Sequence, residues 1–320
     1  MSLSISPRLD HSQIPMIDLS LLAKSESEDE TLNEFIYACS EIGFLYIKNH
    51  GIDSTLIDAL HHQAKLFFNQ PPEIKSQIIL DQKIRGYLPL FYKSYEGEDR
   101  EGISHQEGFW IGHETPANHD RPLDGPNQWP NHPSGLKSTV LKYLEALEAV
   151  SHVLQRGFAA ALGLEPHSFH PFFQQPTSRL KLNHYPPQEN PETDNDIGVV
   201  PHTDSGGFTI LWQDQNGGLE IQDKQGNWVQ APAVEDTFVV NIGNIMQIWS
   251  NGRFASTPHR VINRSGSERY SIPLFVNPDH AAMIKPLIGD QKKDFKPFVY
   301  GEHQLDLWRR TFPIAGIPHL

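Results

Sequence analysis

The sequence predicts a mainly β protein with flanking helices, whose second half forms a double-sheet barrel. Short apolar and β-branched runs follow one another at brief intervals over residues 208–212, 219–222, 228–230, 238–242, 258–262 and 270–276. Turn-forming residues such as Gly217 and Gly218 separate these runs. Periodic helical segments lie before and after them. This pattern favours a jelly roll, a cupin-like double-stranded β-helix in which a ligand cavity opens at one end.

At 320 residues the chain is long enough to bury a large core. We expect one compact unit with four parts in chain order. These are an N-terminal α/β region over 1–135, a backing helix over 136–170, the jelly-roll core over 171–280 and a helical tail over 281–320.

The N-terminal region carries helix and strand signals in alternation. Apolar residues at three-to-four spacing over 31–40 predict an amphipathic helix, which Gly43 ends, and 44–47 reads as a strand. Ser54 is expected to cap a second helix that Pro71 stops.

The remaining segments differ in regularity. Residues 85–133 are rich in Gly, Pro and aromatic residues, so we expect a long, loop-dominated stretch, and such loops are often functional. An apolar stripe over 138–162 predicts the longest helix, which backs the sheet. A further helix is expected over 300–309.

Composition excludes several classes of partner. The formal net charge is −13 and no basic cluster stands out, which excludes nucleic acid and anionic membranes as expected partners. No signal peptide or membrane-spanning run is recognisable. The single cysteine, Cys39, lies in an apolar helical stretch and permits no internal disulfide, so a cytoplasmic protein is expected. Oligomeric state stays open.

One ordered set of residues predicts a metal site. His202 and Asp204 stand at i and i+2, so on an extended strand their side chains share one face. His259 supplies a third ligand from a distant strand. Two imidazoles and one carboxylate suit ferrous iron and leave coordination positions open for catalysis.

A carboxylate-binding pair follows the metal motif. Arg269 and Ser271 are also at i and i+2 in an extended run, so a guanidinium and a hydroxyl face the same side. In the run 179–185, period two divides the side chains between two faces. Lys181, Asn183 and Tyr185 share one face, and Leu180, Leu182 and His184 share the other.

The motifs His-x-Asp, His and Arg-x-Ser occur in this order along the chain. Together with the flanking sequence over 14–18, over 43–51 and on to Pro278, they resemble the iron(II)/2-oxoglutarate-dependent dioxygenase superfamily. The similar branch is the one that includes isopenicillin N synthase and plant flavonoid and gibberellin oxidases. The resemblance implies a jelly-roll fold with catalytic iron(II) on His202, Asp204 and His259.

The resemblance also implies a cosubstrate site and a reaction. The far carboxylate of 2-oxoglutarate would lie on Arg269, Ser271 and Tyr185, with Asn183 completing the family's Asn-x-Tyr element. A small organic molecule would be hydroxylated, desaturated or cyclised, with consumption of dioxygen and release of succinate and carbon dioxide.

In the family, the region that corresponds to 85–133 covers the mouth of the active site. The candidates for substrate contacts are aromatic: Tyr87, Phe109, Trp110 and Phe275. Filling a satellite core beneath the loops is the alternative role for the first three. Trp308 and Phe312 of the tail either line the opening or cover the barrel exterior. Asn244 stands where many relatives carry Asp, which puts a polar contact there in doubt.

Three other functions are compatible with the residues. An iron oxidase of the isopenicillin N synthase type would use Arg-x-Ser for a carboxylate other than that of 2-oxoglutarate. A zinc hydrolase would use the same three ligands but leave Arg269 and Ser271 unexplained. A non-catalytic binding protein on the same fold is the third.

Overall fold

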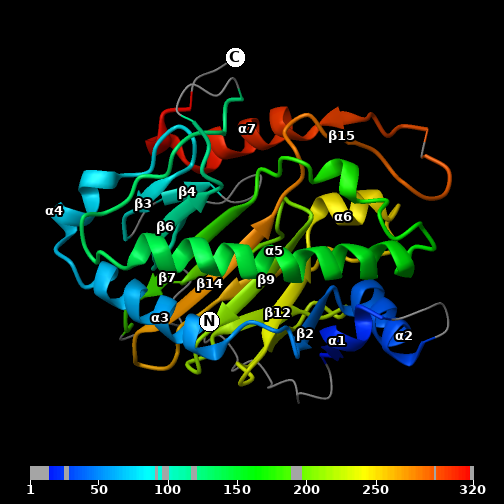
Figure 1. Ribbon diagram of the computed structural model, residues 1–320, viewed down its shortest axis with the longest axis horizontal. Helices are drawn as coiled ribbons and strands as arrows, with labels where there is room; N and C mark the ends of the chain where they lie inside the picture. Colours follow the sequence, from blue (N-terminus) through cyan, green and yellow to red (C-terminus); the bar gives the residue numbers. More distant parts are fainter. Residues whose placement is uncertain are drawn as a thin grey trace.

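The computed structural model describes residues 14–24, 29–90, 93–95, 101–116, 121–188, 197–291 and 293–317. Two β-sheets form the centre, and helices cover one face of the larger sheet (Figure 1). The predicted mainly β architecture with flanking helices is confirmed. In the described part of the chain, no helix has the length and apolar character needed to cross a membrane.

The larger sheet has eight strands in the order β1-β2-β12-β9-β14-β7-β6-β3. Only the β1–β2 pair is parallel among these neighbours. The strands are β1 (Met16–Asp18), β2 (Phe44–Lys48), β3 (Gly86–Leu88), β6 (Glu107–Gly112), β7 (Arg179–Tyr185), β9 (Phe208–Gln213), β12 (Phe238–Ile242) and β14 (Arg269–Val276).

The smaller sheet has four antiparallel strands in the order β11-β10-β13-β8. They are β8 (Val199–His202), β10 (Leu219–Gln222), β11 (Trp228–Gln230) and β13 (His259–Val261). Two further pairs join β4 (Lys93–Tyr95) to β5 (Glu101–Ile103) and β15 (Met283–Ile284) to β16 (Phe298–Val299).

The long helix α5 (Leu136–Ala161) crosses the outer face of the larger sheet, with α3 (Ser54–Phe68) beside it (Figure 1). The other helices are α1 (Leu19–Leu22), α2 (Glu30–Tyr37), the π-helical turn η2 (Ala38–Ile42), α4 (Pro72–Lys75), α6 (Asn244–Trp249) and α7 (Tyr300–Thr311). Short 3₁₀ turns are η3 (Ser76–Ile78), η4 (His170–Phe172) and η5 (Pro313–Ala315).

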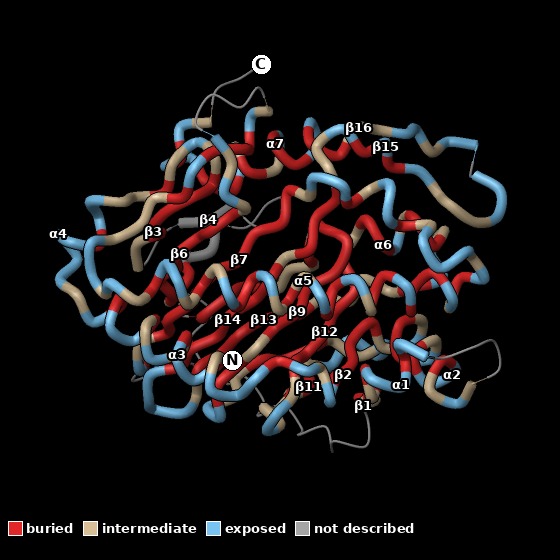
Figure 2. Tube along the Cα trace, in the orientation of Figure 1, coloured by how far each residue is buried: buried red, intermediate tan, exposed pale blue. Residues whose placement is uncertain are grey.

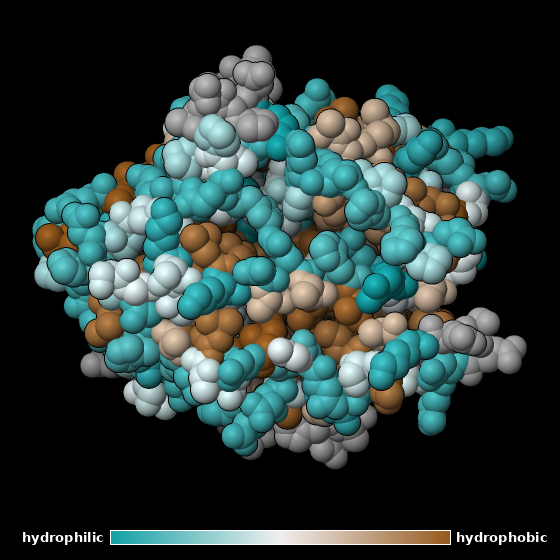
Figure 3. Space-filling view, viewed as in Figure 1, coloured by the Kyte–Doolittle hydropathy of each residue, from teal (hydrophilic) through white to brown (hydrophobic). Residues whose placement is uncertain are grey.

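Three apolar clusters hold these layers together. The largest lies between the helices and the larger sheet, the second between the two sheets, and the third beneath α7. The strands of the larger sheet are buried almost throughout (Figure 2). On the face that carries α5, apolar side chains gather in a band along the helix and hydrophilic ones surround it (Figure 3).

Strand alternation decides which side chains enter the barrel. On β7, Leu180 and Leu182 pack in the helix-covered core, whereas Tyr185 joins the cluster between the sheets. Cross-strand pairing places Ser271 opposite Asn183, and Arg269 opposite Tyr185. The division of faces predicted for this strand is therefore confirmed.

The described part of 85–133 lies mostly outside helices and strands, as predicted, although β3 and β6 within it extend the larger sheet at its β7 edge. One local expectation is wrong. Helix α3 is capped by Asp53, whose carboxylate accepts the Thr55 N–H at 2.9 Å, and Ser54 is already its first helical residue.

Candidate active site

Three metal-ligating side chains meet between the sheets. Asp204 Oδ1 lies 3.7 Å from His202 Nε2 and 3.8 Å from His259 Nε2. One ligand atom from each residue falls within 4.8 Å of the others. A single ion placed among these atoms would contact all three, which is the arrangement that the motif spacing predicted.

The two histidines come together because their strands pair. His202 ends β8 and is the cross-strand partner of His259 on β13. Asp204 follows two residues beyond the end of β8, so it approaches the imidazoles from the loop and not from a strand. The pairing of β8 with β13 thus brings His259, which is far away in sequence, next to His202.

The imidazoles are oriented by the main chain. His202 Nδ1 lies 2.9 Å from the Val200 carbonyl oxygen, and His259 Nδ1 lies 3.3 Å from that of Thr257. Each carbonyl accepts a hydrogen bond from Nδ1–H, which directs Nε2 toward the shared centre. Burial and the neighbouring His202 lower the pKa of His259, which favours the neutral imidazole that a metal requires.

The carboxylate is held by its second oxygen. Asn241 Nδ2 donates to Asp204 Oδ2 at 2.7 Å, and the Thr209 hydroxyl donates to the same oxygen. Burial acts to raise the pKa of Asp204, but the two imidazoles and these hydrogen bonds outweigh it, so the pKa lies below its ordinary value. The carboxylate is therefore ionised, with Oδ1 turned to the histidines.

Arg269 is fully buried and only partly satisfied. Its Nε donates to the Gly217 carbonyl and its Nη2 to Gln213 Oε1 at 3.1 Å. Its Nη1 is buried without a hydrogen-bond partner, and no carboxylate of the described residues contacts the guanidinium. A buried cation with a spare donor requires an anionic partner, which no described residue supplies.

The predicted neighbours of Arg269 surround it. Its guanidinium carbon lies 4.6 Å from the centroid of the Tyr185 ring. Asn183 Nδ2 donates to Ser271 Oγ at 3.2 Å, and Asn183 Oδ1 is buried without a partner. These four side chains form a polar cradle on the inner face of β7 and β14 that suits a carboxylate.

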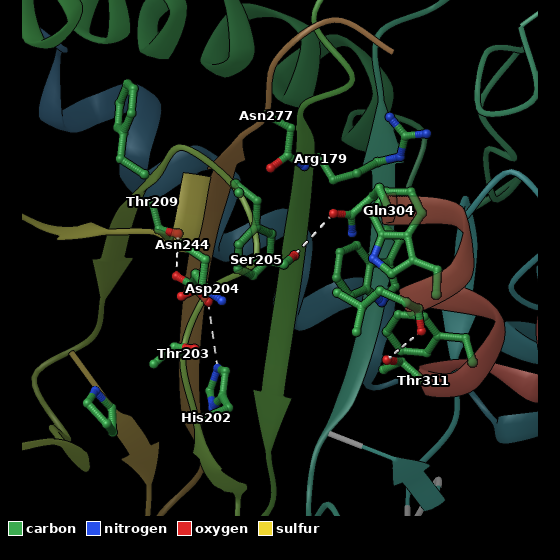
Figure 4. A pocket seen from close by; sticks show the side chains of 18 of the residues that line it. Arg179, His202, Thr203, Asp204, Ser205, Thr209, Asn244, Asn277, Gln304 and Thr311 are labelled. Atoms are coloured by element: carbon green, nitrogen blue, oxygen red, sulfur yellow. Dashed lines mark hydrogen bonds and ion pairs between the residues drawn. The ribbon is translucent and has the colours of Figure 1, made fainter. Parts of the chain in front are cut away.

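A cavity of about 480 Å³ begins at the metal ligands and extends to α7. Figure 4 shows His202, Asp204 and Thr209 on one side and residues of α7 on the other. Aromatic and aliphatic side chains form much of its wall: Trp110, Phe208, Phe275, Leu307, Trp308 and Phe312. Because α7 and the residue after it supply three of these, the tail lines the opening.

Of the four predicted substrate contacts, Trp110 and Phe275 line this cavity and stack on each other at 5.6 Å. The expectation for Tyr87 and Phe109 is wrong, because both pack against Phe67 in the helix-covered core. Alternation on β6 explains this: Phe109 points away from the barrel when its neighbour Trp110 points in, and Tyr87 pairs with Phe109.

Several residues of the site were not predicted from the sequence. Thr209 and Asn241 fix Asp204, Gln213 holds Arg269, and Asn277 lines the cavity. A usable signal was present, because Thr209, Gln213 and Asn241 are polar residues within otherwise apolar strands. Asn244 keeps a polar contact, since its Oδ1 accepts the Ser256 hydroxyl at 2.7 Å.

A double-sheet barrel with two histidines and one carboxylate inside is the arrangement found in mononuclear non-haem iron oxygenases. Comparison with known proteins agrees. Residues 176–278 match the 2OG-Fe(II) oxygenase superfamily, and residues 14–132 match the N-terminal region described as non-haem dioxygenase in morphine synthesis.

Two curated relatives illustrate the similarity. Homoarginine-6-hydroxylase 2-ODD-C23 of Glycine max is 33% identical over 92% of this chain and 96% of its own length. The 2-oxoglutarate-dependent dioxygenase citB of Monascus ruber is 30% identical, over 93% of this chain and 95% of its own. The chain therefore belongs to the iron(II)- and 2-oxoglutarate-dependent oxygenase superfamily.

Solved structures show the same fold. A full-length Neurospora crassa protein in complex with α-KG and thymine superposes with a TM-score of 0.81 at 27% identity, covering 92% of this chain and 95% of that one. JOX2 in complex with 2OG, Fe and JA gives a TM-score of 0.80 at 28% identity, covering 97% and 88%. The protein is thus an oxidoreductase that uses iron(II), 2-oxoglutarate and dioxygen on a small organic molecule.

Proposed function

We propose that His202, Asp204 and His259 hold the iron, and that Arg269, Ser271, Tyr185 and Asn183 hold 2-oxoglutarate by its far carboxylate. The observation that carries this assignment is the buried Arg269, whose Nη1 lacks a partner among the described residues. Arg269 lies on a strand of the larger sheet, whereas the two histidines lie on strands of the smaller one. A dicarboxylate that spans from the ligand set to Arg269 would satisfy both ends.

The bound iron and 2-oxoglutarate supply the oxidative decarboxylation by dioxygen that drives substrate oxidation. The chain's own residues provide geometry. Thr209 and Asn241 fix one oxygen of Asp204 and direct the other to the metal centre. Gln213 and the Gly217 carbonyl hold the Arg269 guanidinium in place. Apolar walls from Trp110, Phe275 and α7 exclude water from the compartment.

Hydroxylation of a small molecule is the reaction we propose. Its support is that three of the relatives are named homoarginine-6-hydroxylases and another a flavonoid 7-O-demethylase. We propose in addition that Trp110 and Phe275 contact the substrate, since both face the cavity. A cytoplasmic location is also proposed, supported by a single, buried cysteine.

Anaerobic addition of 2-oxoglutarate to the iron(II)-loaded protein tests the assignment. We expect a visible metal-to-ligand charge-transfer band with saturable dependence on 2-oxoglutarate. Arg269→Ala should raise the concentration needed for half-saturation at least tenfold, because the charge-assisted contact to the far carboxylate is lost.

Arg253→Ala is the matched control, since Arg253 is an exposed arginine in the loop after α6. Its half-saturation should equal that of the wild type. A protein that binds iron but gives no band would contradict the assignment and favour the oxidase that does not use 2-oxoglutarate. Metal analysis after anaerobic purification would separate both from a zinc hydrolase.

A further inference from the structure

The side chain of Asn277 is a polar group in the cavity wall that has no hydrogen-bond partner among the described residues. It follows directly after β14, is 3% exposed and lines the cavity on the side opposite His202 (Figure 4). Its main chain is engaged, with the N–H donating to Ser178 Oγ at 3.1 Å. Its carboxamide makes no hydrogen bond to any residue that the structure describes.

The surrounding backbone is shaped to admit this carboxamide. A Cβ atom added at Gly206 would lie 2.0 Å from Asn277 Oδ1, so any larger residue there would require the Asn277 carboxamide to move. Gly206 is two residues after the metal ligand Asp204. The amide is therefore held next to the ligand loop, with both its donor and its acceptor left over, and a buried polar group in that state requires a partner.

A second amide adds a donor to the same cavity. Gln304 on α7 is 1% exposed, and its Oε1 accepts from the Tyr300 hydroxyl at 2.9 Å and from the Ser205 hydroxyl at 3.2 Å. With the oxygen occupied twice, the amide is oriented so that Nε2 remains to donate. No described residue accepts from that nitrogen.

Besides the metal ligands, Arg179 is the only charged side chain in the described cavity wall, and the main chain occupies both of its terminal nitrogens. Arg179 donates four hydrogen bonds from Nη1 and Nη2 to main-chain carbonyls, and its guanidinium carbon lies 5.4 Å from the Trp308 ring centroid. Nη1 and Nη2 therefore have no N–H left for a ligand carboxylate, and Nε is buried away from the cavity without a partner among the described residues. The aromatic walls on both sides suit a flat ring.

Resting on the proposed function, we infer that the substrate is a small, planar, uncharged molecule with an amide-type edge, such as a lactam, an imide or an aromatic carboxamide. That edge presents one donor and one acceptor side by side and pairs with both atoms of the Asn277 carboxamide. A carboxylate presents acceptors only, and an amidinium presents donors only, so either would leave one Asn277 atom unpaired. Asn277 is then the residue that determines specificity.

The test compares three ligands that share one ring system: 2-naphthamide, 2-naphthoate and 2-naphthamidine. Binding is measured by anaerobic titration calorimetry on iron(II)-loaded protein. Saturating 2-oxoglutarate is present, so that Arg269 is not available to the carboxylate of 2-naphthoate. We expect 2-naphthamide to bind at least tenfold more tightly than the other two, because each leaves a buried polar atom unpaired.

Asn277→Asp replaces the donor with a second acceptor at nearly constant shape. This substitution should lower the affinity for 2-naphthamide at least tenfold and make 2-naphthamidine the preferred ligand. Asn33→Asp, on the exposed face of α2, makes the same charge change away from the cavity and should alter neither affinity. The charge-transfer band in both variants reports whether the cofactor site is intact.

The outcomes separate the two proposals. If the charge-transfer band is intact, three results would overturn this inference alone. They are equal affinity for the three ligands, a preference for 2-naphthoate, and no measurable binding of 2-naphthamide. An unchanged ligand order in Asn277→Asp would do the same. Absence of the band in the wild type would overturn the proposed function, and this inference with it.

Discussion

The metal site depends on residues that do not touch the metal. Asp204 can present Oδ1 to the centre because Thr209 and Asn241 occupy Oδ2. Both partners are inward-facing residues of adjacent strands of the larger sheet, paired across β9 and β12. Hydrogen bonds of this kind fix the orientation and basicity of a ligand.

Removing these hydrogen bonds should weaken iron binding while leaving the ligands in place. Thr209→Val and Asn241→Leu are each expected to lower the affinity for iron(II) by about 10- to 100-fold. Anaerobic competition with a chromogenic chelator measures this. Thr237→Val is the control, because the Thr237 hydroxyl donates to the nearby Val234 carbonyl outside the site. Unchanged affinity in both site variants would show that Asp204 needs no such support.

At the level of elements, one buried carboxylate ties four segments together. Glu107 on β6 accepts from Lys75 of α4 at 2.6 Å and contacts His184 Nδ1 of β7 at 2.8 Å. The Tyr87 hydroxyl of β3 donates to the same carboxylate. This network lies on the outer face of the sheet, behind strand β7, and so fixes the strand whose inner face carries Asn183 and Tyr185 of the polar cradle.

Glu107→Gln should therefore lower the free energy of unfolding by about 3 kcal/mol at neutral pH, since it leaves the Lys75 ammonium buried without its counter-ion. Denaturant unfolding measures this. Glu41→Gln removes the exposed ion pair with Lys224 and should cost less than about 1 kcal/mol. Equal effects of the two substitutions would contradict the role given to the buried network.

The pH dependence has a defined sign. Burial acts to raise the pKa of Glu107, but hydrogen bonds from His184, Lys75 and Tyr87 outweigh it, so the folded-state pKa lies below its ordinary value. Its stabilisation is present above the ordinary carboxyl pKa and is lost as the pH falls through the lower folded-state value. The difference between wild type and Glu107→Gln should accordingly shrink as the pH is lowered through that range.

At the scale of the whole molecule, the larger sheet joins strands from both ends of the chain. Strands β2 and β6 of the N-terminal region pair with β12 and β7 of the core, β1 and β3 add to them at the two edges, and α5 crosses the sheet (Figure 1). Phe158 of α5 lies at this junction, with ring contacts to Phe35 and Phe208 at 5.1 Å and to Phe254 at 6.0 Å. We therefore expect the four predicted parts to unfold as one unit.

Phe158→Ala should lower the free energy of unfolding by about 3–5 kcal/mol, through lost burial and the cavity left behind. Circular dichroism and tryptophan fluorescence should report the same single transition in wild type and variant. Leu66→Ala on the exposed side of α3 is the control, because Leu66 is 42% exposed, and it should change stability by less than about 0.5 kcal/mol. Two separated transitions would contradict the single-unit prediction.

Much of the site and fold was determined by the sequence alone. Residue type and order predicted His202, Asp204, His259, Arg269 and Ser271, because the chemistry of iron and carboxylates restricts the choice of residue. Period two correctly placed Arg269 and Ser271 on one face of β14, whereas Asp204 lies in the loop after β8. The strands of the barrel and the long helix α5 were predictable for the same reason, since their apolar patterns extend over many residues.

The remaining features were decided by tertiary structure. Register across β6, β7 and β14 determined that Trp110 and Phe275 enter the cavity, while Tyr87 and Phe109 face the helices. Thr209, Asn241 and Asn277 acquire their roles from contacts between strands and loops far apart in sequence. A local pattern indicates that a side chain lies on one face of a strand, but only the packing of the sheets determines what that face meets.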